Sequence, residues 1–480
     1  MNLAGNLWNS ARRFPDNAAV RFYDRVLTYS ELAAAAGRLA AAFRNMRIEN
    51  QSIVALAMPN VPEFVISYYA ALAAGATVLP INPLYTAAEI DYITDDAPPS
   101  LMITHPLTER SPAVVARKKH VPLLFADSLG DPAKKTIHDA MRGFEPECPV
   151  EVDGYETAAI LYTNAVDGFP IGACLTHDNL EFDSEKCAAV ADVHERDAFL
   201  TIIPLYHAFS ATTCMNLPVR QGALTILHET FSEDRAMKSL TDDAVSVFPA
   251  VPAIFKRLLA KFRGAPHDLS SLKAPIPGGA PFEPEAIEDF EKTFSTTVFE
   301  GYGITECGPV TSVNPIARGI RKIGSIGPPL DGIEVKIADE SGAPLPAGAA
   351  GEICVRGRNV MKGYLNRQTE TERYLRDGWF HTGDLGKTDR DGFMYITGRK
   401  KRMIIVGGLN VYPAEVEKIL LLHDSVDACE VHGVPDSLMG ERVAARVKLK
   451  PGAEPDKTRL QKHAREFLAP YKIPREIEFE

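Results

Sequence analysis

Two glycine-flanked segments carry side chains that can hold phosphate and sugar groups. Thr305 and Glu306 follow the Gly-Tyr-Gly turn at 301–303, and a hydroxyl beside a carboxylate can hold a phosphate oxygen together with its Mg²⁺. Asp384 lies in HTGDLG (381–386), where a carboxylate can accept two hydrogen bonds from ribose hydroxyls. Taken alone, each segment also fits an ordinary turn with a solvated carboxylate.

Three further segments are candidates on residue type and spacing. His207 directly follows the apolar run 202–206, although a lone histidine there is usually structural. Segment 160–180 predicts an apolar strand, a loop with two glycines and a proline, and then a helix start. Such loops bind phosphates through backbone N–H groups, but this one contains no lysine and also fits an ordinary strand-to-helix turn. Segment 398–417 combines a cationic cluster, a Gly-Gly loop and a helix opened by Pro413.

The elements that would position these residues follow from the hydrophobic pattern. A short apolar strand (52–60), a helix (63–76) and a second strand (76–83) form a predicted βαβ unit, which implies parallel pairing under a helix. We expect the same arrangement at 224–227, 251–262 and 274–280. Beyond about residue 320, short β-type runs separated by Gly and Pro predict small antiparallel sheets, with a hairpin in 377–402. Helices at 413–422 and 457–468 flank the strands of a compact C-terminal segment.

Composition narrows the class of protein. The 480 residues are 45% hydrophobic and 24% charged, which is ordinary globular usage for two to four structural units. The net charge of −11 and the lack of a long basic run argue against binding to nucleic acid or an anionic membrane. The longest apolar stretch, 68–80, is too short to span a bilayer. The seven cysteines form no CxxC pair. We therefore expect a cytoplasmic protein with no integral membrane segment.

Six segments together resemble one enzyme superfamily. In chain order they are LYTNAVDGFPIGACLTHDNL, PLYHAFS, PGGAP, YGITE, DGWFHTGDLG and GRKKRMIIVGGLNVYPAEVE. Their order and spacing are similar to those of the adenylate-forming (AMP-binding) superfamily, and the N-terminal segments resemble its acyl-CoA synthetase, or fatty acid–CoA ligase, branch. The resemblance covers nearly the whole chain.

This resemblance implies a fold and an activity. The fold would be α/β, with an AMP-binding N-terminal domain (1–400) of mixed and parallel sheets covered by helices, plus a small β-barrel-like part. A small, mobile α+β C-terminal domain (401–480) would follow. The implied reaction joins a fatty or other apolar carboxylic acid to AMP from ATP, with Mg²⁺, and then transfers the acyl group to CoA or an acyl carrier protein.

The resemblance also implies roles for individual residues. The implied catalytic residues are Thr305 at the α-phosphate, Glu306 as the Mg²⁺ ligand and His207 as the gate of the acyl pocket. The implied nucleotide-binding residues are Thr163, Gly168, Gly172, Gly279, Ala280, Gly301, Tyr302, Asp384 and Arg399. Lys401 would lie at the hinge between the domains, and Gly407 and Gly408 would shape the tunnel for the thiol.

Two features depart from the superfamily pattern. The phosphate loop of the superfamily reads Thr-Ser-Gly-Thr-Thr-Gly-x-Pro-Lys-Gly, whereas TNAVDGFPIG (163–172) lacks three of its hydroxyls, a glycine and the lysine, and adds Asp167. The sequence ends at PYKIPREIEFE, shortly before the Pro-x-x-Gly-Lys segment of the superfamily would begin. Both departures concern groups that stabilise the transferring phosphoryl charge.

Alternative functions therefore stay open beside the ligase hypothesis. One is a non-catalytic or ATP-impaired member that binds a nucleotide, an acyl ligand or a partner protein. Another is an enzyme that performs only the thioester half-reaction from a preformed acyl-adenylate. The sequence leaves the acid, its chain length and the oligomeric state open.

Overall fold

The computed structural model describes residues 2–166, 169–264, 267–400, 403–436 and 438–480. The largest sheet of the described residues has seven strands, most of them from the first 176 residues. Its order is β17-β8-β7-β4-β3-β5-β6, and β7, β4, β3, β5 and β6 run parallel. In the same order the strands are Gly363–Tyr364, Phe169–Thr176, Thr157–Val166, Thr77–Pro80, Ile53–Ala57, Leu101–Thr104 and Leu123–Phe125. The β3–α3–β4 unit confirms the prediction for 52–83, and the fully buried α3 (Pro62–Ala73) connects its two parallel strands.

A six-stranded sheet packs beside the first, in the order β12-β11-β9-β10-β1-β2. The strands are Ala274–Pro277, Val247–Ala250, Ala198–Thr201, Leu224–Leu227, Ala18–Phe22 and Arg25–Thr28. The second predicted βαβ unit is wrong in its pairing, because β10 pairs with β9 and β1 rather than with β12. The parallel partner of β12 is β11, a short strand that lies between α10 and α11 and interrupts the predicted connection.

Antiparallel pairing takes over after residue 300. The strands of the third sheet are β15 (Ile333–Ala338), β16 (Gly351–Gly357), β19 (Trp379–Thr388), β18 (Leu375–Arg376) and β20 (Met394–Arg399). A two-stranded ribbon joins β13 (Gly301–Gly303) to β14 (Val310–Val313). The β19–β20 hairpin confirms the sequence prediction. It also places Asp384 directly opposite Arg399 in the strand register.

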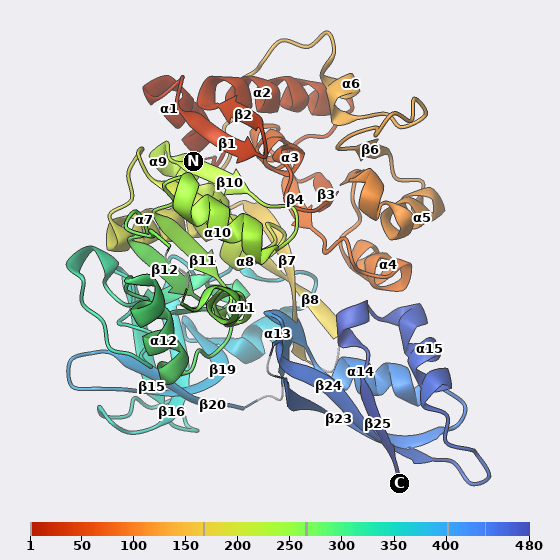
Figure 1. Cartoon of the computed structure of the whole chain (residues 1–480). Coiled ribbons are helices and arrows are strands. Elements are labelled where there is room, and N and C mark those ends of the chain that lie inside the picture. The colour runs from red at the N-terminus through yellow and green to blue at the C-terminus, as the bar shows by residue number, and fades with distance from the viewer. Residues whose placement is uncertain (1, 167–168, 265–266, 401–402, 437) are drawn as a thin grey trace.

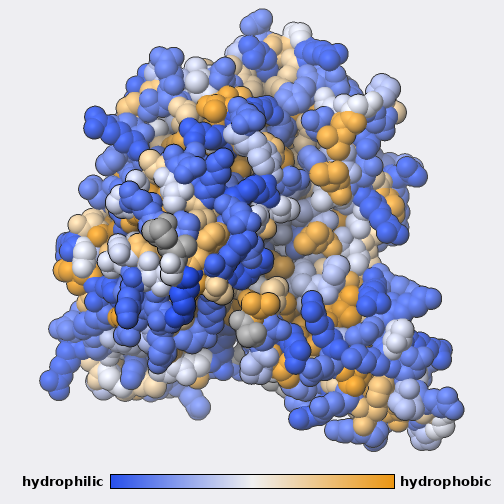
Figure 2. All heavy atoms as spheres, viewed as in Figure 1, coloured by the Kyte–Doolittle hydropathy of each residue, from blue (hydrophilic) through white to orange (hydrophobic). Residues whose placement is uncertain are grey.

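The last part of the chain forms what we call the C-terminal unit, residues 403–436 and 438–480. Its strands are β21 (Ile404–Val406), β22 (Leu409–Val411), β23 (Val426–Asp436), β24 (Gly440–Leu449) and β25 (Glu476–Phe479). They pack with α14 (Pro413–Leu421) and α15 (Lys457–Phe467) around a hydrophobic cluster of their own. Figure 1 shows the unit as a blue lobe below α4, and Figure 2 shows hydrophobic residues gathered where it meets the rest of the molecule.

Helices cover the sheets of the preceding region, and the α/β fold class predicted from the sequence is confirmed. The other α-helices are α1 (Gly5–Arg13), α2 (Tyr29–Asn45), α4 (Ala87–Asp96), α5 (Arg110–Lys119), α6 (Ile137–Met141), α7 (His177–Ala191), α8 (Ala208–Ser210), α9 (Leu217–Gln221), α10 (Glu233–Asp242), α11 (Pro252–Phe262), α12 (Pro284–Phe294) and α13 (Gln368–Tyr374). Short turns of other helix types are η1 (Pro106–Thr108), η2 (Ala211–Asn216), η3 (Thr305–Cys307), η4 (Ile316–Arg318) and η5 (Pro470–Lys472). Within the described residues, no helix has the length and apolar character needed to cross a membrane.

Candidate active site

A cavity of about 740 Å³ lies where the sheets of the N-terminal region meet the C-terminal unit. Sequence-predicted residues that line it are Thr163, His207, Gly279, Thr305, Glu306, Asp384, Arg399, Gly407 and Gly408. Gly172, Ala280, Gly301 and Tyr302 are not among its lining residues, and Gly168 and Lys401 fall outside the described residues. The fold therefore brings segments that are far apart in the sequence to one cavity.

Asp384 is the centre of a hydrogen-bonded group on the cavity wall. The residue is 6% exposed. The Arg399 guanidinium donates to Oδ1 over 2.8 Å, and the Tyr302 hydroxyl donates to Oδ2 over 2.6 Å. Burial, with the Asp384 charge beside it, raises the pKa of Tyr302, so this hydroxyl keeps its proton and acts as a donor. Asp384 thus presents a fixed carboxylate to the cavity. We call Asp384, Arg399 and Tyr302 the carboxylate clamp.

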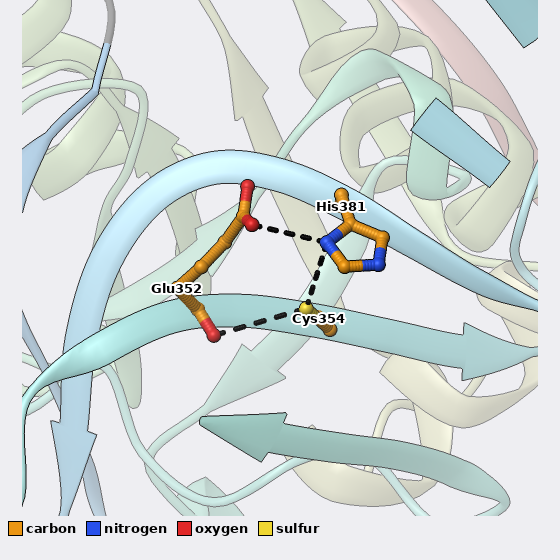
Figure 3. Close-up of side chains that lie close together, drawn as sticks. All are labelled: Glu352, Cys354 and His381. Carbon is orange, nitrogen blue, oxygen red and sulfur yellow. Dashed lines mark hydrogen bonds and ion pairs between the residues drawn. The ribbon is translucent and has the colours of Figure 1, made fainter. Parts of the chain in front are cut away.

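Hydrogen bonds to Glu352 on β16 hold the turn that carries Asp384 in place. One Glu352 oxygen accepts from the Gly383 N–H at 3.0 Å, and the other lies 3.0 Å from both Lys400 Nζ and His381 Nδ1. Figure 3 shows the His381 ring directed at Glu352 and at Cys354, whose Sγ lies 3.4 Å from Nδ1. The Lys400 backbone N–H also donates to the Gly383 carbonyl. These bonds fix the turn and therefore the direction of the Asp384 carboxylate.

Glu352, Cys354 and His381 are also residue types that bind soft metals. Both oxygens of Glu352 are already bonded, to Gly383 on one side and to His381 and Lys400 on the other. Burial raises the pKa of Cys354 to about 11, so its thiol stays protonated near neutral pH. The cluster fits a structural hydrogen-bond network better than a metal site.

Thr305 and Glu306 begin η3, directly after β13. Glu306 is 8% exposed, and its Oε1 accepts from the Tyr364 hydroxyl over 2.8 Å. Burial, followed by the Glu306 charge, raises the pKa of Tyr364. The carboxylate fits a Mg²⁺ ligand, because it is a hard oxygen donor that lines the cavity and is held in place by a neighbouring hydroxyl.

His207 lines the same cavity at the start of α8. Burial lowers the pKa of its imidazole to about 4, so the ring is neutral at physiological pH. Its Nε2 atom is buried and has no hydrogen-bond partner within the described part of the chain. An unpaired buried nitrogen is costly, and a polar group of a bound ligand would satisfy it.

The structure corrects the prediction for segment 160–180. The apolar strand and the helix start are confirmed as β7 and as α7, which begins at His177 after a capping box at Thr176. The predicted loop between them is wrong, because β8 occupies most of it and pairs with β7 as an antiparallel hairpin. Thr163 lines the cavity. Gly172 pairs with Tyr162 inside the hairpin, where a Cβ atom would lie 2.7 Å from Ile160 Cγ2. The N-terminus of α7 follows the far end of β8, and neither Thr176 nor His177 lines the cavity, so this helix end does not face a phosphate bound there.

Ile171 occupies the position of the superfamily's phosphate-loop lysine. Its side chain is 4% exposed and belongs to the main hydrophobic core. Asp167, the other notable change, lies outside the described residues. At position 171 the hairpin therefore contributes to packing and offers no positive charge to the cavity.

A second, apolar pocket of about 90 Å³ adjoins the first. The two share Phe209, Gly279, Gly303 and Pro309 as lining residues. Gly301 and Tyr302 line the smaller pocket, whereas Ala280, a partly exposed residue, lines neither. Side chains such as Val190, Phe199, Val247 and Ile316 make its wall almost entirely apolar.

The C-terminal unit closes one side of the large cavity with Gly407 and Gly408. Both glycines have positive φ, +60° and +88°. A Cβ atom on Gly408 would lie 2.5 Å from Val251 Cγ1, so only glycine allows this close approach to the opposite wall. Tyr412 lines the cavity beside the loop, and burial, followed by the nearby Glu306 charge, raises its pKa.

Comparison with known proteins places this cavity in a family. Residues 7–365 match the AMP-binding enzyme family, and residues 415–479 match the AMP-binding enzyme C-terminal domain. The chain belongs to the AMP-binding enzyme family. A long-chain-fatty-acid–CoA ligase from Bacillus subtilis is 37% identical, with 98% of this chain and 90% of the relative covered. A feruloyl-CoA synthase from Amycolatopsis is 35% identical, with 98% and 93% covered.

A solved structure of the same family superimposes over almost the whole chain. It is a variant of o-succinylbenzoate CoA synthetase from Bacillus subtilis, bound with its product analogue OSB-NCoA. The TM-score is 0.89 at 27% identity, and 99% of this chain and 94% of that chain are covered. The adenylate-forming superfamily predicted from the motifs is thus confirmed. The roles of individual residues, and the domain boundary predicted at 400/401, stay predictions.

Sequence reasoning missed several residues of this AMP-binding enzyme site. Glu352, which holds the turn before Asp384, and Tyr364, which holds Glu306, lie outside the motifs that were used. Phe209 follows His207 by two positions and lies between the two pockets. Its presence in the PLYHAFS segment was a usable signal, because an aromatic residue beside a candidate gate can also line the pocket.

Proposed function

We propose that this AMP-binding enzyme is an acyl-CoA synthetase-like ligase that joins an apolar carboxylic acid to CoA through an acyl-adenylate. One observation supports this most: a single cavity is lined by the carboxylate Asp384, the acid Glu306 and the Gly407–Gly408 loop, and it adjoins an apolar pocket. Asp384 would bind the nucleoside and Glu306 the metal-bound phosphate. The glycine loop would admit the thiol, and the apolar pocket would hold the acyl group. The names of the relatives point to the same class of reaction.

The proposed chemistry has two steps. In the first, an oxygen of the acid attacks the α-phosphorus of ATP, and the bond to pyrophosphate breaks. In the second, the CoA sulfur attacks the acyl carbonyl, the carbon–oxygen bond to AMP breaks, and the thiol proton is released. Mg²⁺ held by Glu306 would neutralise phosphate charge when bound. Asp384 and Arg399 would hold the ribose, Thr305 would contact the α-phosphate, and His207 would stand neutral at the entrance to the acyl pocket.

The small pocket sets the size of acid that we propose. A volume of about 90 Å³ corresponds to roughly six to nine water-sized groups. A compact aromatic acid or a fatty acid of medium length would fill this space, whereas a longer chain would require the pocket walls to move. The carboxylate would then lie near Gly303 and Phe209, which line both pockets.

A second candidate function is the thioester half-reaction alone. It is favoured by the β7–β8 hairpin, where the side chain at position 171 packs in the core and brings no positive charge to the phosphates. Such an enzyme would keep the nucleoside and thiol sites and would take a preformed acyl-adenylate. Both candidates use the same cavity and differ in the step that involves pyrophosphate.

The test is a two-arm assay with a panel of aromatic, medium-chain and long-chain acids. In one arm, ATP, Mg²⁺ and CoA are supplied, and AMP and acyl-CoA are measured. In the other, the synthetic acyl-adenylate replaces the acid and ATP. Turnover in both arms supports the full ligase, and turnover in the second arm alone supports the half-reaction. Silence in both arms, with the folded protein still binding AMP, would refute catalysis and leave ligand binding as the function.

A further inference from the structure

A buried lysine of the C-terminal unit is bonded to both parts of the molecule. Lys472 ends η5 and is 1% exposed. Its Nζ donates to Glu415 Oε1 on α14 over 2.7 Å, within its own unit. It also donates to Glu89 Oε1 on α4 over 2.8 Å, and α4 belongs to the N-terminal region. The two carboxylates are themselves 6% and 9% exposed at their side chains.

Neighbouring contacts join the same two parts of the molecule. We call this boundary, where residues 85–89 meet the C-terminal unit, the seam. The Thr86 hydroxyl, at the N-cap of α4, donates to the Phe467 carbonyl at the end of α15 over 3.0 Å. Lys472 Nζ lies 4.8 Å from the centre of the Tyr85 ring, close enough for a cation–π contact. Figure 1 shows α4 directly above α15 in this part of the molecule. One short segment, residues 85–89, therefore carries a hydroxyl, an aromatic ring and a carboxylate that all meet the C-terminal unit.

The position of the C-terminal unit against the N-terminal region decides how many carboxylates balance the Lys472 charge. Taking an ammonium group out of water is unfavourable unless its charge is matched by close partners. Glu415 stays beside Lys472 wherever the C-terminal unit lies, because both belong to it. Glu89 and Tyr85 are partners only in the observed arrangement, so they favour this arrangement over others in which the seam is open.

Lys472 is also connected to the cavity through its own unit. The η5 turn packs against β22, the strand that directly follows Gly408. A shift at the seam would therefore move β22 and, with it, the loop that approaches Val251. The seam and the glycine loop are therefore connected through the contact of η5 with β22 inside the C-terminal unit.

We propose that Lys472 is a positioning residue, whose bond to Glu89 holds the Gly407–Gly408 loop at the cavity for transfer of the acyl group to the thiol. The proposal rests on the proposed function, because it assigns the seam to the second of its two steps. Lys472 touches neither substrate nor cofactor. It acts by keeping the C-terminal unit where the thiol can reach the acyl-adenylate.

Glu89→Gln is the variant that tests this proposal, because it replaces the partner in the N-terminal region and leaves Glu415 in place. Glu89 also completes the capping box of α4 by accepting from Thr86. Glu31→Gln is the matched control, because Glu31 completes the same kind of capping box with Thr28 at the start of α2 and pairs with no lysine in the described part of the chain. Both full-length variants should fold, and their melting temperatures should agree within a few degrees.

Two half-reactions are measured separately. Acyl-CoA formation from a preformed acyl-adenylate should be at least tenfold slower in Glu89→Gln, whereas acyl-adenylate formation from the acid and ATP should change less than twofold. Glu31→Gln should match the wild type in both. Equal losses in both half-reactions, or behaviour like that of Glu31→Gln, would overturn the proposal.

Hydrogen exchange, which needs no catalytic turnover, tests the role of Lys472 independently of the proposed function. Hydrogen exchange at β22 and α4 should accelerate in Glu89→Gln and stay unchanged in Glu31→Gln. If the wild type forms no acyl-CoA in either arm, the proposed function fails, and the role of Lys472 in transfer fails with it. If the wild type is active and exchange in Glu89→Gln is unchanged, only the role of Lys472 is refuted.

Discussion

The two ends of the large cavity are built in contrasting ways. At one end, the Asp384 carboxylate receives hydrogen bonds from Arg399 and Tyr302, and Glu352 fixes the turn that carries it. At the other end, the β7–β8 hairpin contributes Thr163 to the cavity lining, whereas Ile171, which pairs with Thr163 across the strands, is buried in the hydrophobic core and does not line the cavity. The first end is preorganised for a polar ligand, and the second contributes mainly packing.

This contrast separates two tasks that are often treated as one. Binding a nucleoside needs fixed donors and acceptors, whereas transferring a phosphoryl group needs positive charge where negative charge develops. The carboxylate clamp meets the first need independently of the hairpin. Affinity for AMP and the rate of acyl-adenylate formation should therefore respond to different substitutions.

The largest expected effect is that of Glu306→Gln. Loss of the carboxylate removes the proposed Mg²⁺ ligand, so acyl-adenylate formation should fall by about 10²–10³-fold, measured as acid-dependent pyrophosphate release. Affinity for AMP should be nearly unchanged. The control is Glu300→Gln, since Glu300 accepts from the Gly324 N–H outside the cavity lining. A comparable loss of AMP affinity in Glu306→Gln would contradict the separation of tasks.

The next effect in size is that of Asp384→Asn on nucleotide binding. A charge-assisted hydrogen bond contributes about 1.5–3 kcal/mol, so affinity for AMP should fall roughly 10- to 150-fold in calorimetric titrations. Asp389→Asn is a suitable control, because Asp389 lies on the same hairpin and pairs with Lys322 instead. If AMP binds to Asp384→Asn as it does to the wild type, the clamp is not the nucleoside site.

A pH series examines His207 in the lining of the large cavity. The pKa of His207 is about 4 in the fold, against an ordinary value of 6.5. As pH falls below 6.5, the unfolded chain takes up a proton that the folded chain refuses, so the free energy of unfolding should fall, by about 2 kcal/mol at pH 5. In His207→Phe, urea unfolding between pH 5 and 6.5 should show a slope smaller by about 1 kcal/mol per pH unit. An unchanged slope would show that the buried imidazole is not the titrating group.

The smallest expected effect is a gain in Ile171→Lys. Ile171 pairs across the strands with Thr163, which lines the cavity, so the longer lysine side chain can extend to the cavity and add one charge-assisted contact to the phosphates. Acyl-adenylate formation should therefore rise by up to about tenfold, while the melting temperature falls because a core side chain is lost. Ile171→Met keeps an apolar chain of similar length and should show no gain. Equal rates in the two variants would show that charge at position 171 does not limit the reaction.

Elements defined by local patterns were predicted well, and those defined by packing were not. The strand–helix–strand unit at 52–83 is visible because its apolar runs have the length and period of its elements. The β7–β8 hairpin was misread because Pro170 and Gly172 resemble loop residues. Gly172 is required instead by the close approach of Ile160 inside a strand, and no local pattern reveals that contact.

The same limit applies to the candidate site. Asp384, Glu306 and His207 could be named because each stands in a short recognisable segment. The residues that hold them in place are distant in sequence: Tyr364 is 58 positions from Glu306, and Glu352 is 31 positions from Gly383. Lys472 and Glu89 are 383 positions apart. Such pairs form only when the chain folds, so their partners could not be inferred from spacing.

The parallel pairing of β1 with β10 has a consequence for how the chain folds as it is synthesised. Val20 pairs with Thr225, so the N-terminal strand must wait while about 205 further residues are made, which takes roughly 10–40 s at ordinary rates of synthesis. Until then one edge of β1 has no strand partner and must avoid wrong pairings. Its antiparallel neighbour β2 is ready at once, and the early hairpin can protect the other edge of the strand during this delay.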